Sequence, residues 1–322
     1  MSLKISRLGY LGLGIESTPG TPVASTTTVP FIANTIKGKH EFIGDISARA
    51  SRAQNFSSVL GKQWGEGELT VNVDTLSAGF LFKLATGTES VNTIAANVYD
   101  HVFYTTVSGN TPLTATLYQY QGVDTQQFSS MAIDKIDFEI KDALMTAKAT
   151  FKGFFPTSGS HTPTTVSGTL LSFANYNIKL GSSLITAASA TPSPVTDFKL
   201  TIDNNAEAIF ESGQPRTSRI FWKELKVAGE FTRFFETIVD RDNYYNLNKQ
   251  SLVLTASGIG LSNGYSELLT INLAKIAYKD SEITTGLENF YAIKTQFVAE
   301  VDTIQNKQYD IILRNFRSTA YA

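Results

Sequence analysis

Two stretches of the chain alternate between apolar and polar residues over unusually long runs. In residues 196–204, Phe198, Leu200 and Ile202 alternate with polar residues, and the same pattern continues through residues 222–236. Successive side chains of a β-strand point to opposite faces of a sheet, so each run predicts a strand with one apolar face and one polar face. The two runs therefore predict a pair of long strands that pack on a core on one side and face water on the other.

The same two-faced pattern recurs along the chain. Residues 64–74 alternate cleanly, with Asp74 in the N-cap position of a helix, Phe80 and Leu84 at helical spacing, and Gly87 at its stop. This order predicts a strand that leads directly into a short helix. Further strands are predicted at residues 41–54, 101–107, 113–121, 132–142, 144–155, 251–257, 268–279 and 290–301.

The two halves of the chain follow the same order of predicted elements. Each half runs from a long strand pair to a short helix, a short strand and a second long pair, and the second helix is expected at residues 235–245. The pattern predicts a mainly β protein with a duplicated domain, long antiparallel hairpins and one short helix per half. The predicted parts are an N-terminal arm (1–35), a first domain (36–156), a linker with short strands at 168–180 and 183–187 (157–195), and a second domain (196–322).

Composition narrows the functional classes. The 322 residues are 42% apolar and 17% charged, with a formal net charge of −2, so a core is expected and a strongly basic surface that grips nucleic acid is not. The absence of cysteine excludes disulfides, thiolate metal sites and cysteine nucleophiles. Neither a signal peptide nor an apolar run of membrane-spanning length is recognisable, which predicts folding in the cytoplasm and no membrane partner.

No catalytic or metal-binding motif stands out. His40, His101 and His161 are about 60 residues apart without matching carboxylates, and we expect them to be surface or turn residues. Asp240 and Asp242 lack the alternating ligands and glycine of a calcium loop. A nucleophile elbow and a phosphate-binding loop are also missing. The prediction is a protein that is not an enzyme and holds no cofactor or metal.

Several short segments carry the motifs of one known family. They are residues 14–23 (GIESTPGTPV) with Val29-Pro30 soon after, the strand 65–74 before its Leu-rich helix, residues 225–236 (LKVAGEFTRFFE), and residues 311–315 after an alternating strand. Together they resemble tail tube proteins of long-tailed bacteriophages. The resemblance extends over most of the chain, and its N-terminal motif is the most specific.

The resemblance implies a structural role in the virion tail. Subunits of this family form rings that stack into a hollow conduit for viral DNA delivery into the host, and each tube domain contributes two long hairpins to a continuous inner β-barrel. Members with two fused domains form trimeric rings that imitate a hexamer, so a trimer is the preferred expectation and a hexamer the second. The implied partners are other copies of the chain, other tail proteins and transiting double-stranded DNA without specific binding. Assembly would take place in the host cytoplasm.

The resemblance also implies which residues make contacts between subunits or rings. The N-terminal arm would clamp neighbouring subunits, and the long polar segment 205–220 resembles a loop that reaches the adjacent ring. The residues expected at these contacts are Glu16, Glu207, Glu211, Arg216 and Arg219.

In such a tube the polar faces of the long strands would line the channel. The acidic residues expected there are Asp45, Glu66, Glu68, Asp137, Glu139, Asp203, Glu224, Glu230 and Glu300, and the basic ones are Arg49, Lys135, Lys141, Lys148, Lys152, Lys199, Lys226 and Lys294. The two sets nearly cancel. Because binding to DNA grows with the number of phosphates that are neutralised, a balanced lining would let the duplex slide.

Two other classes fit parts of the pattern. A secreted carbohydrate-binding β-sandwich or adhesin would present aromatic residues on polar strand faces, whereas the strand after Trp64 presents Glu66, Glu68, Thr70 and Asn72. An outer-membrane barrel would use strands of about this length but would need an export signal. A hydrolase has the least support, because nothing converges on a nucleophile.

Overall fold

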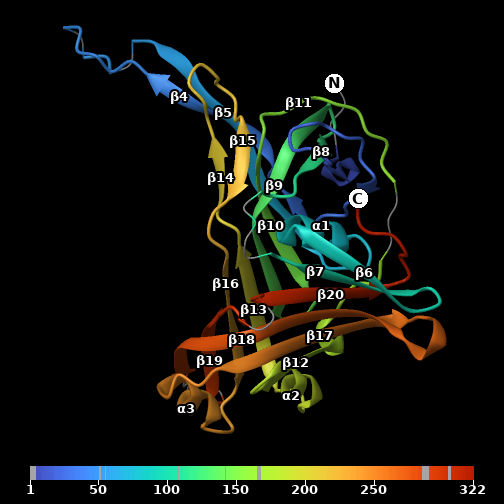
Figure 1. Ribbon diagram of the computed structural model, residues 1–322. Coiled ribbons are helices and arrows are strands. Elements are labelled where there is room, and N and C mark those ends of the chain that lie inside the picture. Colours follow the sequence, from blue (N-terminus) through green and yellow to red (C-terminus); the bar gives the residue numbers. More distant parts are fainter. Residues whose placement is uncertain are drawn as a thin grey trace.

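The computed structural model describes residues 5–50, 52–54, 56–106, 109, 111–141, 143–164, 168–284, 290–303 and 306–322. It is mainly β, as the sequence predicts, with one large sheet of 18 strands and a separate two-stranded hairpin. Every ladder between the named strands is antiparallel (Figure 1).

The N-terminal half of the chain contains strands β1 to β11. They are β1 (Tyr10–Ile15), β2 (Thr27–Thr28), β3 (Ala33–Asn34), β4 (Lys37–Gly44), β5 (Ser58–Asn72), β6 (Thr88–Ala95), β7 (Val98–Tyr104), β8 (Ala115–Tyr120), β9 (Thr125–Lys141), β10 (Thr146–Gly153) and β11 (Thr157–Ser158). Helix α1 (Ala78–Thr86) follows β5, and a 3-10 turn at Ser6–Leu8 precedes β1.

The C-terminal half of the chain contains strands β12 to β20. They are β12 (Tyr176–Gly181), β13 (Val195–Asp203), β14 (Ala206–Ile209), β15 (Arg219–Trp222), β16 (Lys226–Phe234), β17 (Gln250–Gly260), β18 (Ser266–Thr284), β19 (Ala292–Ala299) and β20 (Tyr309–Asn315). Its helices are α2 (Leu184–Ser189) and α3 (Val239–Tyr245), with 3-10 turns at Phe173–Asn175 and Ser262–Gly264.

Eight of these strands form one continuous surface, which we call the long-strand sheet. Its order is β4-β5-β10-β9-β13-β16-β19-β18, and the β9–β13 ladder joins the two halves of the chain. In Figure 1 its central strands run up and down the view, whereas β17, β20 and β7 run across it as a second layer. The core lies between the layers and includes Phe138, Phe151, Phe198, Phe231 and Phe297.

Two very long strands take part in both layers. The first residues of β9 pair with β8, and its last ten pair with β10 and β13. In the same way β18 begins between β17 and β20 and ends beside β19. Ser130 has a left-handed φ of 52° where β9 changes layers, so a local backbone irregularity accompanies the bend.

The short helix predicted after β5 and its end at Gly87 are confirmed, but its N-cap is Ser77 and not Asp74, which lies in the turn before the helix. Asp74 Oδ1 accepts hydrogen bonds from the backbone N–H groups of Leu76 and Ser77 at 2.7 and 2.6 Å, so its carboxylate satisfies donors at the start of the helix. Gly87 ends α1 with a left-handed φ of 81°, the conformation that favours glycine at this position. The apolar side chains of α1 are buried against β9 and β7.

Several sequence expectations are wrong in detail. Residues 183–187 form the start of helix α2, because Ser183 and Thr186 make a reciprocal capping box. The strand expected at 41–54 ends at Gly44, and residue 107 of another expected strand lies outside the described residues. The polar segment 205–220 is mostly the β14–β15 hairpin.

Part of the predicted N-terminal arm belongs to the body of the protein. Strand β1 pairs with β8 along its whole length, and Leu11 and Leu13 are fully buried. The C-terminal strand β20 likewise pairs with β7 of the other half. Both ends of the chain therefore fasten the N-terminal half, and Figure 1 shows the two termini on the same side of the molecule.

His101 is a core residue, not the surface or turn residue expected from sequence. Its side chain is fully buried, with Nδ1 2.7 Å from Glu89 Oε1 and Nε2 2.9 Å from the carbonyl oxygen of Arg317. Glu89 also pairs with Lys83 at 3.1 Å and accepts a hydrogen bond from the backbone N–H of Tyr321. This network joins β6, β7 and α1 to the C-terminal segment. His40 is exposed and His161 half-buried.

We expect Glu89→Gln to lower the free energy of unfolding by about 3 kcal/mol, the usual cost of removing one partner of a buried ion pair. Burial alone favours the neutral acid, but hydrogen bonds from His101 and Lys83 hold the pKa of Glu89 below its ordinary value of 4.5. A lowered pKa stabilises the folded state above pH 4.5, and this contribution is lost as the pH falls through the folded-state pKa. Denaturant unfolding at several pH values measures the effect.

The matched control for this prediction is Glu224→Gln, since the Glu224 side chain is 63% exposed. It should change stability by less than about 0.5 kcal/mol. If the difference in the free energy of unfolding between the wild type and Glu89→Gln stayed the same well below pH 4, this would contradict the assigned role of the carboxylate.

The described residues show no helix long and apolar enough to cross a membrane. Within the same parts of the chain, no three His, Asp or Glu side chains gather as metal ligands would.

Candidate functional site: the charged face of the long-strand sheet

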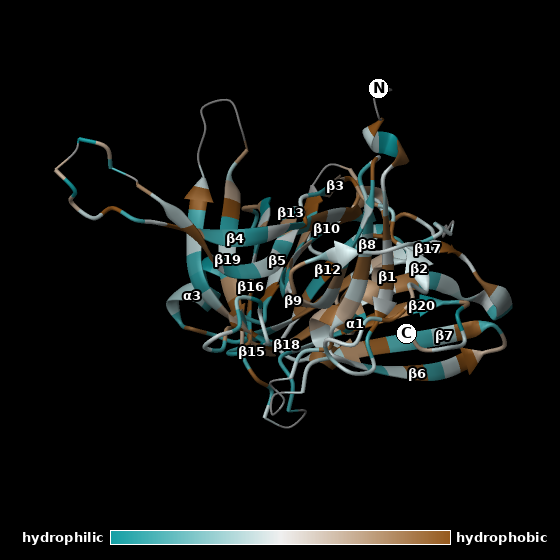
Figure 2. Ribbon diagram, turned by 90° about the horizontal axis from the view of Figure 1, so that it is seen from above, coloured by the Kyte–Doolittle hydropathy of each residue, from teal (hydrophilic) through white to brown (hydrophobic). Residues whose placement is uncertain are grey.

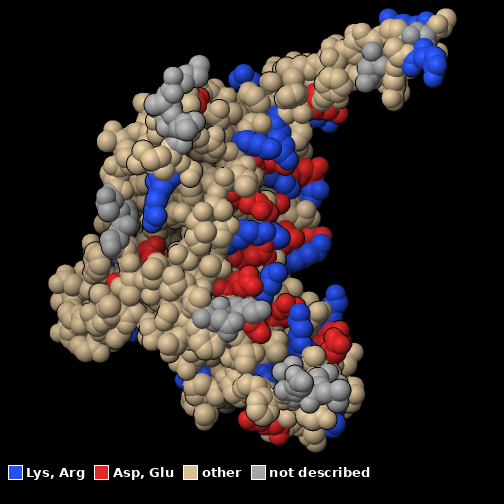
Figure 3. All heavy atoms as spheres, turned by 180° about the vertical axis from the view of Figure 1, so that it is seen from behind, with Lys and Arg blue, Asp and Glu red and all other residues tan. Residues whose placement is uncertain are grey.

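One face of the long-strand sheet carries most of the charged residues predicted to act together. Figure 3 shows them as a column of acidic and basic side chains that follows the sheet below the projecting β4–β5 hairpin. The opposite face is apolar and buried. The exposed fractions of Ile136, Phe138, Leu200 and Phe231 on that face are all 1% or less. The predicted division of each strand into a dry and a wet side is therefore confirmed for these strands.

The strand register arranges the charges in rows that cross the sheet. In one row Lys135 of β9 lies opposite Asp203 of β13, which lies opposite Lys226 of β16. In the second row beyond this one, Glu139 of β9 lies opposite Lys199 of β13, and Lys199 lies opposite Glu230 of β16. Opposite charges at facing positions attract, whereas like charges would repel. These two rows therefore alternate in sign, whereas the row between them continues from Asp137 to the uncharged Thr201 and Ala228.

Ion pairs on this face neutralise most of its charges locally. Lys148 lies 3.3 Å from Glu68, Lys135 lies 3.1 Å from Asp137, and Lys294 lies 3.0 Å from Glu230. Asp137 also accepts a hydrogen bond from the hydroxyl of Thr201 at 2.6 Å. Burial alone lowers the pKa of Lys135, but Asp137, Asp203 and Glu68 outweigh it and raise that pKa.

Glu66 shows the same balance near the edge of the sheet. It pairs with Lys39, and the indole N–H of Trp64 donates to its other oxygen. Burial raises the pKa of Glu66, whereas the hydrogen bonds from Lys39 and Trp64 lower it further, so the net pKa lies below its ordinary value. The carboxylate therefore stays ionised with its partners.

Three predicted face residues lie beyond the ends of their strands. Asp45 and Arg49 pair with each other in the irregular tip beyond β4, away from the strand rows. Glu300 follows the end of β19 and pairs with Lys249 at 2.5 Å and Lys275 at 3.1 Å. Alternation alone suggested that their strands continue, but the strands end at Gly44 and Ala299. Asp45 and Arg49 therefore lie off the strand rows, whereas Glu300 lies one residue beyond the last position of β19, and its place on the charged face stays a prediction.

Residues 6–287 match the family model described as phage tail tube protein. The match covers most of the sequence. The chain belongs to the phage tail tube protein family. No curated protein of similar sequence was found.

Family membership makes the chain a structural subunit of a phage tail tube and a component of the virion tail. It confirms the resemblance deduced from the short motifs, three of which (residues 14–23, 65–74 and 225–236) lie wholly inside the matched range. It gives no support to the adhesin or outer-membrane alternatives. Tube proteins act by self-assembly with other tail proteins, so the surfaces that can meet a second copy are the next features of interest.

Glu16 is not on such a surface, which corrects its predicted contact role. The residue is 2% exposed, and its carboxylate accepts hydrogen bonds from the hydroxyls of Thr114 and Thr116 at 2.7 Å. The backbone N–H groups of Ser130 and Gly20 donate to it at 2.8 and 2.9 Å. Glu16 therefore anchors β1 to the bend of β9 inside the tail tube subunit. No neighbouring subunit could reach it.

The other four predicted contact residues lie on or beside the β14–β15 hairpin. Glu211, Arg216 and Arg219 are exposed, whereas Glu207 is half-buried and pairs with Lys223. Arg216 forms a parallel bridge to Gln63 of β5, and its guanidinium lies 5.6 Å from the Phe155 ring centroid. The hairpin thus rests on β5 of its own chain, with charged side chains still open to a neighbour.

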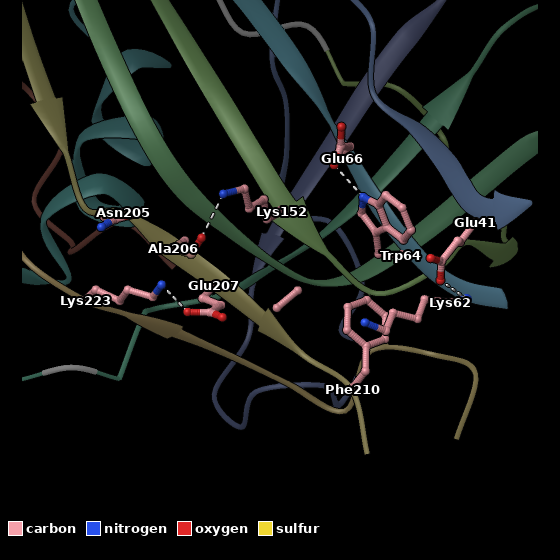
Figure 4. A pocket seen from close by; sticks show the side chains of 11 residues that line it. Glu41, Lys62, Trp64, Glu66, Lys152, Asn205, Ala206, Glu207, Phe210 and Lys223 are labelled. Carbon is pink, nitrogen blue, oxygen red and sulfur yellow. Dashed lines mark hydrogen bonds and ion pairs between the residues drawn. The ribbon is translucent and has the colours of Figure 1, made fainter. Parts of the chain in front are cut away.

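A hollow of about 510 Å³ separates this hairpin from β5 and β10 (Figure 4). Lys152 donates to the carbonyl oxygen of Ala206 across it at 2.8 Å, and the rings of Trp64 and Phe210 lie 6.1 Å apart, edge to face. Most of the charged groups in the wall are already paired. The hollow is therefore better explained as the place where the hairpin packs on β5 and β10 than as a reaction site.

Sequence analysis missed a group of exposed apolar residues on the projecting β4–β5 hairpin. They are Phe42, Ile43, Ile46, Val59 and Leu60, with exposed fractions from 46% to 70%. Figure 1 shows this hairpin reaching out from the body at one end of the long-strand sheet, with α3 near the other end. The available signal was the pairs Phe42-Ile43 and Val59-Leu60, which make both strand faces apolar in a hairpin with no layer to cover them.

A second exposed apolar group surrounds α3. It consists of Ile238, Val239, Tyr245, Leu247 and Phe290. Figure 1 places β4 and α3 at opposite ends of the sheet, and the view from above in Figure 2 shows both elements on the same side of the molecule. An apolar surface at each end is what a subunit needs if it contacts a like subunit head to tail.

Proposed function

We propose that copies of this chain complete the long-strand sheet into a closed ring, and that stacked rings form the conduit for viral DNA. The observation that carries the proposal is the open sheet, in which, among the described residues, β4 on one side and the last part of β18 on the other have no strand partner on their outer edge. Open edges pair readily with other chains, and closure through neighbouring copies removes them. The charged face would then surround the channel.

The alternating charges support passage of DNA without specific binding. A lining that neutralised many phosphates would hold the duplex, because affinity rises with each counterion released. On this face Lys148, Lys135 and Lys294 already form ion pairs with Glu68, Asp137 and Glu230, respectively. The lysines are therefore not free to form a continuous basic track along the duplex.

The duplicated strand order favours a ring of three copies, with six as the second possibility. The N-terminal half contributes β4-β5-β10-β9 and the C-terminal half contributes β13-β16-β19-β18, so one chain supplies two equivalent units. About 24 strands at ~4.8 Å spacing and ~40° tilt make a barrel of roughly 48 Å between backbones. This leaves room for a duplex after side chains are subtracted.

Stacking of rings is assigned to the two exposed apolar groups and the polar β14–β15 hairpin. The β4–β5 tip would meet the α3 end of a subunit in the next ring, while Glu211, Arg216 and Arg219 would supply charged contacts. Assembly in the host cytoplasm and attachment to other tail proteins complete the proposed role.

Electron microscopy of the purified chain tests the proposal. We expect rings at moderate concentration and hollow rods at high concentration, with three-fold symmetry in end-on class averages. Light scattering after size-exclusion chromatography should give a multiple of the 35.1 kDa subunit. A chain that stays monomeric at every concentration would overturn the proposal, and six-fold rings with six subunits would overturn the trimer.

A further inference from the structure

The two halves of the chain can be superposed residue by residue through their strand registers. Residues 67–70 of β5 have the sequence GELT, and residues 229–232 of β16 have the sequence GEFT. A Cβ atom on Gly67 would lie 2.4 Å from Ile36 Cα, and one on Gly229 would lie 2.5 Å from the carbonyl oxygen of Lys199. In both halves the glycine therefore lets a neighbouring strand approach closely.

The second hairpin of each half confirms the equivalence. Thr70 lies opposite Lys148 of β10, and Thr232 lies opposite Lys294 of β19. Phe151 follows Lys148 by three residues, and Phe297 follows Lys294 by three residues. The ladder between β10 and β9 has a bulge just before Phe151, and the ladder between β19 and β18 has one just before Phe297. These coincidences make β9 equivalent to the end of β18, with Asp137 at the position of Glu282 and Lys135 at that of Asp280.

The same reasoning makes β13 equivalent to the edge formed by β3 and β4. Ala33 lies opposite Thr70, and Asp197 lies opposite Thr232. Thr201 and Asp203 of β13 therefore correspond to Lys37 and Lys39. In the chain itself β9 pairs with β13, with Asp137 opposite Thr201 and Lys135 opposite Asp203.

We propose that this internal seam is the template for the contact between copies. The end of β18 in one copy pairs antiparallel with β3–β4 of the next copy, which places Glu282 opposite Lys37 and Asp280 opposite Lys39. The inference rests on the proposed ring and adds its strand partners, their direction and their register.

The charges on the two edges support this register independently of the repeat. Lys37, Asp280 and Glu282 are exposed and form no ion pair with any other described residue. In the proposed register one edge offers two acids where the other offers two lysines. A shift by one residue would turn each of them to the opposite face.

The register also continues a row of charges across the boundary. Lys294 lies opposite Glu282 in one copy, and Lys37 lies opposite Glu66 in the next, with Lys152 beyond. Joining Glu282 to Lys37 gives an unbroken alternation of basic and acidic residues. Two rows within one chain, Lys135-Asp203-Lys226 and Glu139-Lys199-Glu230, follow the same alternation.

Disulfide trapping in this cysteine-free chain tests the register. Facing residues of an antiparallel pair have Cα atoms about 4.5–5.5 Å apart, which a disulfide can span, whereas diagonal neighbours are about 7–8 Å apart. We expect assembled Lys37→Cys/Glu282→Cys to give cross-linked dimers and trimers, and no larger species, on a non-reducing gel after mild oxidation. The diagonal control Lys37→Cys/Asp280→Cys should cross-link at least tenfold less.

The outcomes separate the register from the ring. Rings that cross-link better in the diagonal pair than in the facing pair overturn the proposed register but leave the tube standing. A wild-type chain that forms no rings overturns both. A ladder that continues to six subunits keeps the register and overturns the trimer.

A charge reversal provides a second measurement that requires no oxidation. Lys37→Glu should raise the concentration needed for ring formation severalfold, since it faces Glu282 with a like charge at every seam. Adding Glu282→Lys to the same chain should restore ring formation to near the wild-type concentration. Failure of the second change to rescue the first, with both variants folded by circular dichroism, would overturn the pairing.

Discussion

Phe231→Asp is expected to abolish tube assembly by disrupting the core beneath the charged face. Phe231 is 1% exposed and lies opposite Phe198, with the rings of Tyr278 and Phe297 each 6.1 Å away. A carboxylate in this position has no cation to pair with and loses its hydration. We expect a loss of more than about 4 kcal/mol in the free energy of unfolding, a large part of the stability of a typical domain.

The matched control is Thr232→Asp, one residue further along β16. Thr232 is half-buried on the charged face, where a carboxylate can remain hydrated and lies between Lys294 on one side and Asp197 on the other. This variant should unfold at nearly the wild-type temperature and still form tubes. Thermal unfolding and negative-stain microscopy measure both variants. Intact tubes from Phe231→Asp would mean that the two faces of β16 are assigned the wrong way round.

Phe42→Asp combined with Val59→Asp is expected to stop rings from stacking while leaving single rings intact. The two side chains are 64% and 63% exposed on the projecting hairpin, so the folded subunit does not depend on burying them. Burying apolar surface of this kind in a contact is worth about 25 cal/mol per Å². Replacing it with two carboxylates removes that gain and adds a desolvation cost. Rod length in electron micrographs measures the loss.

Ser57→Asp combined with Ser58→Asp provides the control, because it adds the same charge to exposed polar positions of the same hairpin. Its rods should remain at least half as long as those of the wild type. If the apolar pair and the serine pair shorten the rods equally, then charge and not lost apolar contact explains the effect. Rods of normal length from Phe42→Asp/Val59→Asp would place the stacking contact elsewhere.

The faces of the long strands could be predicted from sequence because a strand alternates at every residue. Phe198, Leu200 and Phe231 are buried as their spacing indicates, and Lys199 and Glu230 lie on the charged face between them. Helix α1 followed from the helical spacing of Phe80 and Leu84 and from its end at Gly87, signals that act over a few residues, although its N-cap is Ser77 and not Asp74. These features depend on neighbours close in sequence, so the sequence carries them in full.

Tertiary structure decided where charged and polar groups with distant partners lie. Glu16 is held by Thr114, Thr116 and Ser130, and His101 by Glu89 and the C-terminal segment. A buried polar side chain looks the same in sequence as an exposed one, because only its partners distinguish them. The partners of Glu16 named here and the carbonyl of Arg317 beside His101 are about 100 or more residues away, and Glu89 is 12 residues from His101 on the neighbouring strand.

The sequence by itself determined a mainly β chain with two-faced strands and nearly balanced charge on their polar side, and it predicted two similar halves. Only the tertiary structure decided that β9 and β18 bend from one layer to the other, that β9 joins β13, and that the outer edges of β4 and of the end of β18 have no strand partner among the described residues. The physical reason is that alternation assigns a side chain to a face, whereas strand order and register depend on contacts between segments far apart in the chain.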